Sequence, residues 1–284
     1  MIEAVIGDID VVAELVDARI PLASKNPDIE RIIANKPKIL ILNKADLANP
    51  AATKRWAAYY RKKGYHVISL NSLRLDTKVF FNAIDEVTKE KAARDARRGI
   101  KNRMIKIMLL GIPNVGKSTL INSLSGEKRA QTGDRPGVTR GKQWITLKNG
   151  AMLLDMPGIL WPRLDNQHAA LNLAITGAIK NEVLDIEDIA AKFLSIMKDG
   201  YEAELCTRYK LTPPLPDDPR ELLGLIGKKR GFIVSGGEID YERAAIILID
   251  EFRGGKIGRI TLDRADLIEK VSADKPQKPI DSDQ

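Results

Sequence analysis

The chain has 284 residues, of which 44% are hydrophobic and 30% charged, so it can bury a core and is longer than most single domains. Its 46 lysines and arginines outnumber its 38 aspartates and glutamates, and this excess favours a polyanionic partner. The single cysteine, Cys206, excludes an internal disulfide and a zinc site built from several cysteines, and no apolar run is long enough to span a bilayer. We therefore expect a cytoplasmic protein of two domains that does not bind membranes.

The first half of the chain alternates continuous apolar runs with helical patterns. Continuous apolar runs are typical of the buried strands of a parallel sheet. In chain order, the sequence predicts strands at 10–16, 38–43, 66–71, 105–110, 143–147 and 151–154, and helices at 26–35, 51–63, 76–98 and from about 117. This alternation predicts a doubly wound, mostly parallel α/β sheet.

The pattern changes after about Leu164, because the later segments are helical and are separated by polar turns. Asp185 and Asp240 each precede a helical apolar pattern and are expected to cap those helices. We therefore predict an α/β domain at 1–164, a smaller all-helical domain at 165–271 and a polar, disordered tail at 272–284.

A phosphate-binding motif lies between a predicted strand and a predicted helix. Gly111 to Ser118 matches G-x-x-x-x-G-K-[ST], in which backbone N–H groups cradle phosphate oxygens at a helix N-terminus. Lys117 is expected to reach the β and γ phosphates and Ser118 to bind magnesium. A tight turn alone would explain the glycines but not the adjacent lysine and serine. The expected phosphate-binding residues are Gly111, Asn114, Val115, Gly116, Lys117, Ser118 and Thr119.

Two further segments fit a magnesium-dependent phosphate site. Asp155-Met-Pro-Gly158 follows an apolar run, and it supplies a carboxylate for magnesium and a glycine N–H for the γ-phosphate. The polar loop at 131–142 contains Thr139, whose hydroxyl is expected to close onto magnesium when the γ-phosphate is present, unless it is an ordinary loop threonine. The expected catalytic residues are Lys117, Thr139 and Gly158.

Asn43-Lys44-Ala45-Asp46 follows a strand and matches the N-K-x-D pattern that recognises guanine. An aspartate can accept hydrogen bonds from guanine N1–H and the 2-amino group together, which adenine cannot supply. Asn71 and Ser72 lie where a short loop would complete the base pocket. We therefore expect GTP and GDP as ligands, with a merely structural Asp46 as the alternative. An ATPase or a small-molecule kinase is disfavoured, because the sequence lacks a second phosphate-acceptor motif.

The base motif precedes the phosphate motif, whereas an ordinary GTPase begins with the phosphate motif. With these residues the chain closely resembles the ribosome-biogenesis GTPase A (YlqF) family of circularly permuted GTPases. The resemblance rests on DARIP (17–21), NKAD (43–46), GIPNVGKSTLIN (111–122), TGDRPGVT (132–139), DMPGILWP (155–162), TGAIK (176–180) and SGGEIDY (235–241).

The resemblance implies a circularly permuted P-loop GTPase domain followed by a helical domain that contacts ribosomal RNA. It implies a bacterial assembly factor that hydrolyses GTP on a precursor of the large (50S) ribosomal subunit, with rRNA and ribosomal proteins as partners. We expect it to act as a monomer. Family members have an upstream Phe-Pro-Gly-His-Met segment containing the histidine proposed for catalysis. That segment has no counterpart here, so the sequence leaves open whether this N-terminus is native or truncated.

No group that positions the attacking water is evident in the sequence. Ile159 follows Gly158, where many GTPases place a glutamine, and a lone histidine such as His168 is more often structural than catalytic. Asn114 resembles the asparagine that coordinates a potassium ion in GTPases without this glutamine. We therefore expect slow intrinsic hydrolysis that the ribosomal particle stimulates. A nucleotide-gated RNA-binding scaffold with negligible hydrolysis is the alternative.

Basic residues of the helical half are candidates for RNA phosphate contacts. The alternative is pairing with the C-terminal ends of helices. These residues are Lys228, Lys229, Arg230, Arg253, Lys256 and Arg259.

Overall fold

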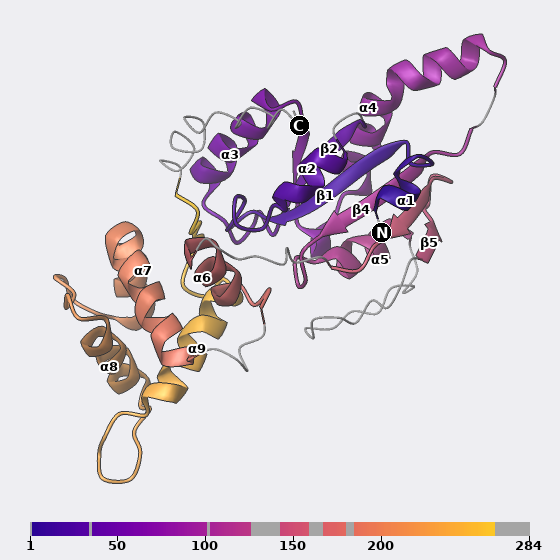
Figure 1. Ribbon diagram of the computed structural model, residues 1–284. Helices are drawn as coiled ribbons and strands as arrows, with labels where there is room; N and C mark the ends of the chain where they lie inside the picture. The colour runs from indigo at the N-terminus through magenta and orange to yellow at the C-terminus, as the bar shows by residue number, and fades with distance from the viewer. Residues whose placement is uncertain are drawn as a thin grey trace, which may run out of the picture.

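The computed structural model describes residues 2–33, 36–100, 103–125, 143–158, 167–179 and 185–264. Figure 1 shows a sheet with helices around it and, beside it, a group of helices from the second half of the chain. We call these the α/β unit and the helical unit. Within the described residues, no helix is both long and apolar enough to cross a membrane.

The sheet contains six strands within the described residues, in the order β3-β2-β1-β4-β6-β5. All neighbouring strands are parallel except β5 and β6. The strands are β1 (Val11–Asp17), β2 (Lys38–Asn43), β3 (His66–Ser69), β4 (Lys106–Gly111), β5 (Gln143–Thr146) and β6 (Met152–Asp155). The doubly wound, mostly parallel sheet expected from the sequence is therefore confirmed, and the strand order reverses between β1 and β4.

Helices connect the strands in the α/β unit and make up most of the helical unit. The α/β unit contains α1 (Glu3–Ile6), α2 (Pro27–Ile32), α3 (Pro50–Lys62), the 3-10 turn η1 (Ser72–Arg74), α4 (Thr77–Arg97) and α5 (Lys117–Ser125). The helical unit contains α6 (Gln167–Ile175), α7 (Ile186–Tyr209), α8 (Pro219–Arg230) and α9 (Tyr241–Arg253). Asp185 and Asp240 cap α7 and α9 as expected, because each side chain accepts backbone N–H groups of the first turn.

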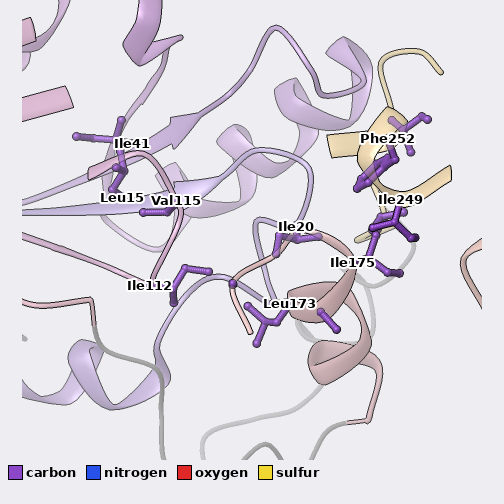
Figure 2. Close-up of a cluster of buried hydrophobic side chains, with 14 of the residues drawn as sticks. Leu15, Ile20, Ile41, Ile112, Val115, Leu173, Ile175, Ile249 and Phe252 are labelled. Atoms are coloured by element: carbon purple, nitrogen blue, oxygen red, sulfur yellow. The ribbon is translucent and has the colours of Figure 1, made fainter. Parts of the chain in front are cut away.

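Burial on both faces explains why β1 is apolar almost throughout. Val11, Ala13 and Leu15 face one hydrophobic cluster, while Val12 and Val16 face two clusters on the opposite side. The first cluster continues from the sheet into α6, α7 and α9, so the two units share one core. Figure 2 shows its junction, where side chains of the α/β unit lie near those of α6 and α9.

The segment after α9 returns to the α/β unit. Ile260 N donates to Leu47 O at 3.0 Å, and Leu262 N donates to Arg19 O at 2.8 Å. The Asp263 carboxylate is buried and accepts hydrogen bonds from the backbone N–H groups of Leu22 (2.6 Å) and Ala23 (2.8 Å). These contacts fix the helical unit against the loops that follow β1 and β2.

Candidate nucleotide site

Most of the candidate residues lie at one edge of the sheet. Asn43 ends β2, Gly111 ends β4 and Asp155 ends β6, and these strands belong to one parallel set. The carboxyl ends of parallel strands share an edge, and ligands of open α/β sheets bind there, beside the point where the strand order reverses. The base motif and the phosphate motif lie on the two sides of that point.

The phosphate loop runs from the end of β4 to the first turn of α5, and glycine is needed at two of its positions. A Cβ atom on Gly111 would lie 2.8 Å from the Leu15 carbonyl oxygen, so glycine allows β4 to pack against β1. Gly116 has φ +99°, and a Cβ atom there would lie 2.4 Å from Asn43 Nδ2. The loop leads into a helix N-terminus, where backbone N–H groups and the helix dipole favour an anion. Ser118 and Thr119 are half-buried on that first turn.

Asn43 connects three parts of the site. Its Nδ2 donates to Val115 O in the phosphate loop at 2.7 Å. Its Oδ1 accepts from the Ser72 backbone N–H at 3.0 Å and from the Ser72 hydroxyl at 2.8 Å. Asn71 Oδ1 accepts from Leu73 N at 2.8 Å and so caps η1. The side chains of Asn43, Asn71 and Ser72 therefore fix the loops around the expected base pocket.

Lys44 reaches across to the phosphate loop. Its Nζ donates to Asn114 O at 2.8 Å and lies 3.2 Å from the carboxylate of Asp17. Asp17 also pairs with Arg19 at 2.8 Å. Burial alone would raise the pKa of Asp17, but Arg19 and Lys44 hold it well below its ordinary value.

The sequence interpretation used Asp17 and Arg19 only as part of the DARIP signature and did not predict the ion pair between Asp17 and Lys44 of the base motif. The available signal was the position of Asp17, a carboxylate at the end of the strand beside β2.

The Asp46 carboxylate is exposed, and no hydrogen bond or ion pair within the described residues holds it. The loop that carries it is fixed from both units. Ala45 N donates to Leu70 O at 3.2 Å, and Arg259 of the helical unit donates to Ala45 O at 3.1 Å. The backbone is thus held while the carboxylate faces solvent, as base recognition requires.

Lys117 and Asp155 lie together at the centre of the site. Lys117 Nζ donates to Asp155 Oδ1 and to Met156 O, both at 2.5 Å, and both side chains are buried. Gly158 lies against the phosphate loop, since a Cβ atom there would be 3.0 Å from Pro113 N. Thr139, its loop and Ile159 lie outside the described residues, so their expected roles stay predictions.

His168 lies at the junction of the two units. Its Nε2 is 3.2 Å from Asn172 Nδ2 and 3.9 Å from Asp263 Oδ1. These contacts agree with the structural role that its sequence context favours.

Several basic candidates for RNA contacts also make contacts within the protein. Arg253 donates to the carbonyls of Ala174 and Ile175 at the end of α6, which is the alternative role expected for it. Arg230 pairs with Glu251. Lys228, Lys229 and Lys256 are exposed.

Comparison with known proteins gives consistent results. The family model described as "50S ribosome-binding GTPase" matches residues 106–207. Ribosome biogenesis GTPase A of Bacillus cereus is 46% identical over 256 residues, covering 90% of this chain and 86% of that protein. A GDP-bound YlqF structure has a TM-score of 0.69 at 26% identity, covering 93% of this chain and 99% of its own. The GNP-bound YlqF structure from T. maritima has a TM-score of 0.65 at 26% identity, with coverage of 93% and 97%.

Proposed function

The chain belongs to the ribosome biogenesis GTPase A family of circularly permuted GTPases, and we propose that it hydrolyses GTP during assembly of the large ribosomal subunit. The nucleotide would lie between the base motif and the phosphate loop. The observation that best supports this is a pair of hydrogen bonds, from Asn43 to Val115 O and from Lys44 to Asn114 O. They hold the two motifs side by side although they are about seventy residues apart and in permuted order.

Guanine selectivity would come from Asp46. Its exposed carboxylate can accept from guanine N1–H and from the 2-amino group, and the loop behind it is held by Arg259 and Leu70. Lys117 and the backbone N–H groups of the phosphate loop would bind the phosphates, and the Gly158 N–H would contact the γ-phosphate.

Ser118, Thr139 and Asp155 would hold magnesium. Hydroxyl and carboxylate oxygens are the hard ligands that this ion prefers, and Asp155 ends β6 beside the phosphate loop. When bound, magnesium neutralises charge on the phosphates. We further propose that Asn114, which lies in the phosphate loop, contributes its Oδ1 to a potassium ion beside the phosphates.

The partner would be a precursor of the large subunit, contacted through rRNA and ribosomal proteins. We propose an α/β domain at 1–164 and a helical, RNA-binding domain at 165–271. The overall excess of positive charge and the exposed Lys228, Lys229 and Lys256 of the helical unit support binding to a polyanion. We also propose that the protein acts as a monomer. Its GTP hydrolysis in isolation would be slow, because the Ile159 side chain cannot position the attacking water.

The test compares particle affinity and GTPase rate. We expect tighter binding to large-subunit precursors with a non-hydrolysable GTP analogue than with GDP, and faster GTP hydrolysis when particles are present. Small-subunit particles serve as the control. Equal affinities in both nucleotide states with no rate increase would contradict the proposal. Nucleotide-dependent binding without any hydrolysis would favour the scaffold function instead.

A further inference from the structure

A continuous hydrogen-bond network joins the candidate nucleotide site to the helical unit. We call it the junction network. Its members are Asp17, Arg19, Lys44, Asn114, Gly177 and Arg253. On one side, Lys44 pairs with Asp17, Asp17 pairs with Arg19, and Arg19 Nη1 donates to Arg253 O at 3.4 Å. The network thus reaches the end of α9 from the base motif.

On the other side the network returns from α9 to the phosphate loop. The Arg253 guanidinium donates from Nε to Ile175 O and from Nη2 to Ala174 O, both at 2.8 Å. Gly177 follows two residues after α6, and its carbonyl accepts from Asn114 Nδ2 at 2.7 Å. Because Lys44 Nζ donates to Asn114 O, the network closes on itself at the nucleotide site.

Arg253 and the turn after α6 together fix where the chain leaves this helix. Gly177 N donates to Ala174 O at 3.0 Å, and the planar guanidinium adds donors to the Ala174 and Ile175 carbonyls. It also packs directly on Gly177, where a Cβ atom would lie 3.3 Å from Arg253 Cζ. Gly177 has φ +79°, which glycine adopts without strain. The position of the Gly177 carbonyl therefore depends on Arg253 as well as on the backbone hydrogen bond of this turn.

Asn114 is the member through which this position reaches the phosphate site. Its backbone has φ 57°, a left-handed conformation that a residue with a Cβ atom adopts at a cost of about 1 kcal/mol. Hydrogen bonds at both ends of the residue hold it there, from its side chain to Gly177 and from Lys44 to its carbonyl. The direction of the neighbouring phosphate-loop N–H groups follows from this conformation.

Buried hydrophobic side chains pack next to the junction network. Ile112 and Val115 of the phosphate loop belong to the same buried cluster as Leu173, Ile175 and Phe252 of the helical unit (Figure 2). The Arg19 guanidinium stacks on Phe252, with its Cζ atom 5.0 Å from the ring centroid. Close-packed interiors transmit displacements because they deform little.

We propose that Arg253 is a positioning residue of the nucleotide site. It acts through Gly177 on Asn114, so the helical unit controls how long the nucleotide stays bound. This proposal rests on the proposed nucleotide site. Linkage then requires that nucleotide binding, in turn, stabilises the contact between α6 and α9.

The first measurement is the dissociation rate of a fluorescent GDP analogue from the full chain. Arg253→Lys keeps the charge but removes the two-pronged donor, and we expect dissociation to become about tenfold faster, or about 1.4 kcal/mol. Arg243→Lys is the matched control, because Arg243 lies on the same helix and stacks on Phe232, outside the junction network. Its rate should equal that of the parent.

The second measurement tests whether Arg253 acts through Asn114. In an Asn114→Ala background, Arg253→Lys should add no further increase, whereas independent effects would multiply. Multiplying effects, or an unchanged rate in Arg253→Lys, would overturn the proposal. Arg253→Gln, which keeps an amide donor but loses the charge and the second arm of the guanidinium, takes the place of Arg253→Lys if that variant fails to fold. Failure of the parent to bind GDP would instead overturn the nucleotide site itself.

Discussion

Lys117 Nζ lies 2.5 Å from Asp155 Oδ1, so the phosphate-loop lysine and the carboxylate at the end of β6 neutralise each other inside the site. Both side chains are buried. Removing one partner of a buried pair leaves an uncompensated charge and typically costs about 3 to 5 kcal/mol. A bound phosphate would supply the missing negative charge to Lys117.

Asp155→Asn should therefore lower the stability of the nucleotide-free protein but not weaken GDP binding measured in EDTA. The gain in affinity that the parent shows on adding magnesium should be lost, since Asp155 is an expected magnesium ligand. Calorimetric titration of GDP with and without magnesium checks both statements. Asp188→Asn, which removes an exposed carboxylate paired with Lys192, is the control. An unchanged magnesium effect in Asp155→Asn would exclude Asp155 from the metal site.

Gly116→Ala should abolish nucleotide binding. The new methyl group would lie 2.4 Å from Asn43 Nδ2, so Asn43 and the phosphate loop cannot both keep their places. Gly150→Ala is a matched control, because Gly150 also has a positive φ (+82°) but has no atom within 4 Å of its Cβ position. Both variants should lose about 1 kcal/mol of stability from backbone strain, and only Gly116→Ala should lose GDP affinity. Equal GDP affinities would refute the assigned role of this close contact.

Asp46→Asn should shift nucleotide preference from guanine towards xanthine, by about 1 to 3 kcal/mol for the lost charged hydrogen bonds. Stability should not change, because the carboxylate has no partner within the described residues. Competition between GDP and xanthosine diphosphate, with melting temperatures as the control, measures both. A parent protein that binds ADP as tightly as GDP would defeat the base assignment.

Asp17→Asn should make stability less dependent on pH. The pKa of Asp17 is held below its ordinary value of 3.8 by Arg19 and Lys44, against the effect of burial. A lowered pKa means that the carboxylate stabilises the fold above about pH 4, and that this contribution is lost as the pH falls further.

The free energy of unfolding of the parent should therefore exceed that of Asp17→Asn by about 3 kcal/mol at pH 7, and this difference should shrink below pH 4. Urea unfolding at several pH values measures it. Asp76→Asn removes an exposed carboxylate from an N-cap that asparagine fills equally well, so it should change little. A difference between parent and Asp17→Asn that is constant with pH would contradict the ion pair.

The sheet could be predicted from sequence because β1, β2 and β4 are buried on both faces and are therefore continuous apolar runs. Their ends differ from the prediction by at most one residue. The third strand ends at Ser69 and not at Asn71, because Asn71 instead caps η1. Local capping chemistry decides such ends, and the apolar pattern does not contain it.

The contacts within the site were harder to predict, because they join distant parts of the chain. Asp17 and Arg19 contact Lys44 and Phe252, and no local pattern connects these positions. Arg253 is basic and is the last residue of α9, so its charge alone is consistent with an RNA contact as well as with the two α6 carbonyls that it binds. Motif spacing predicts the ligand-binding groups, but only tertiary packing shows which groups hold them.

GTP hydrolysis should be faster in potassium than in sodium at equal ionic strength, because Asn114 is expected to contribute an oxygen ligand to a potassium ion beside the phosphates. The Asn114 side chain has one observed contact and one expected role. Its Nδ2 donates to Gly177 O at 2.7 Å, and its Oδ1 is the oxygen expected to bind the ion. Such an ion would supply part of the positive charge that an arginine finger supplies elsewhere.

Two substitutions separate the contact from the expected role. Asn114→Asp keeps an oxygen ligand but cannot donate to Gly177, so it should retain the potassium response while releasing GDP faster. Asn114→Ala removes both groups, and its rate should be the same in potassium and sodium. Steady-state hydrolysis rates in matched chloride salts, together with GDP release rates, distinguish the outcomes. If the parent hydrolyses GTP equally fast in both salts, the proposed potassium site at Asn114 is wrong. If Asn114→Ala retains the parent's full preference for potassium, the ion binds elsewhere.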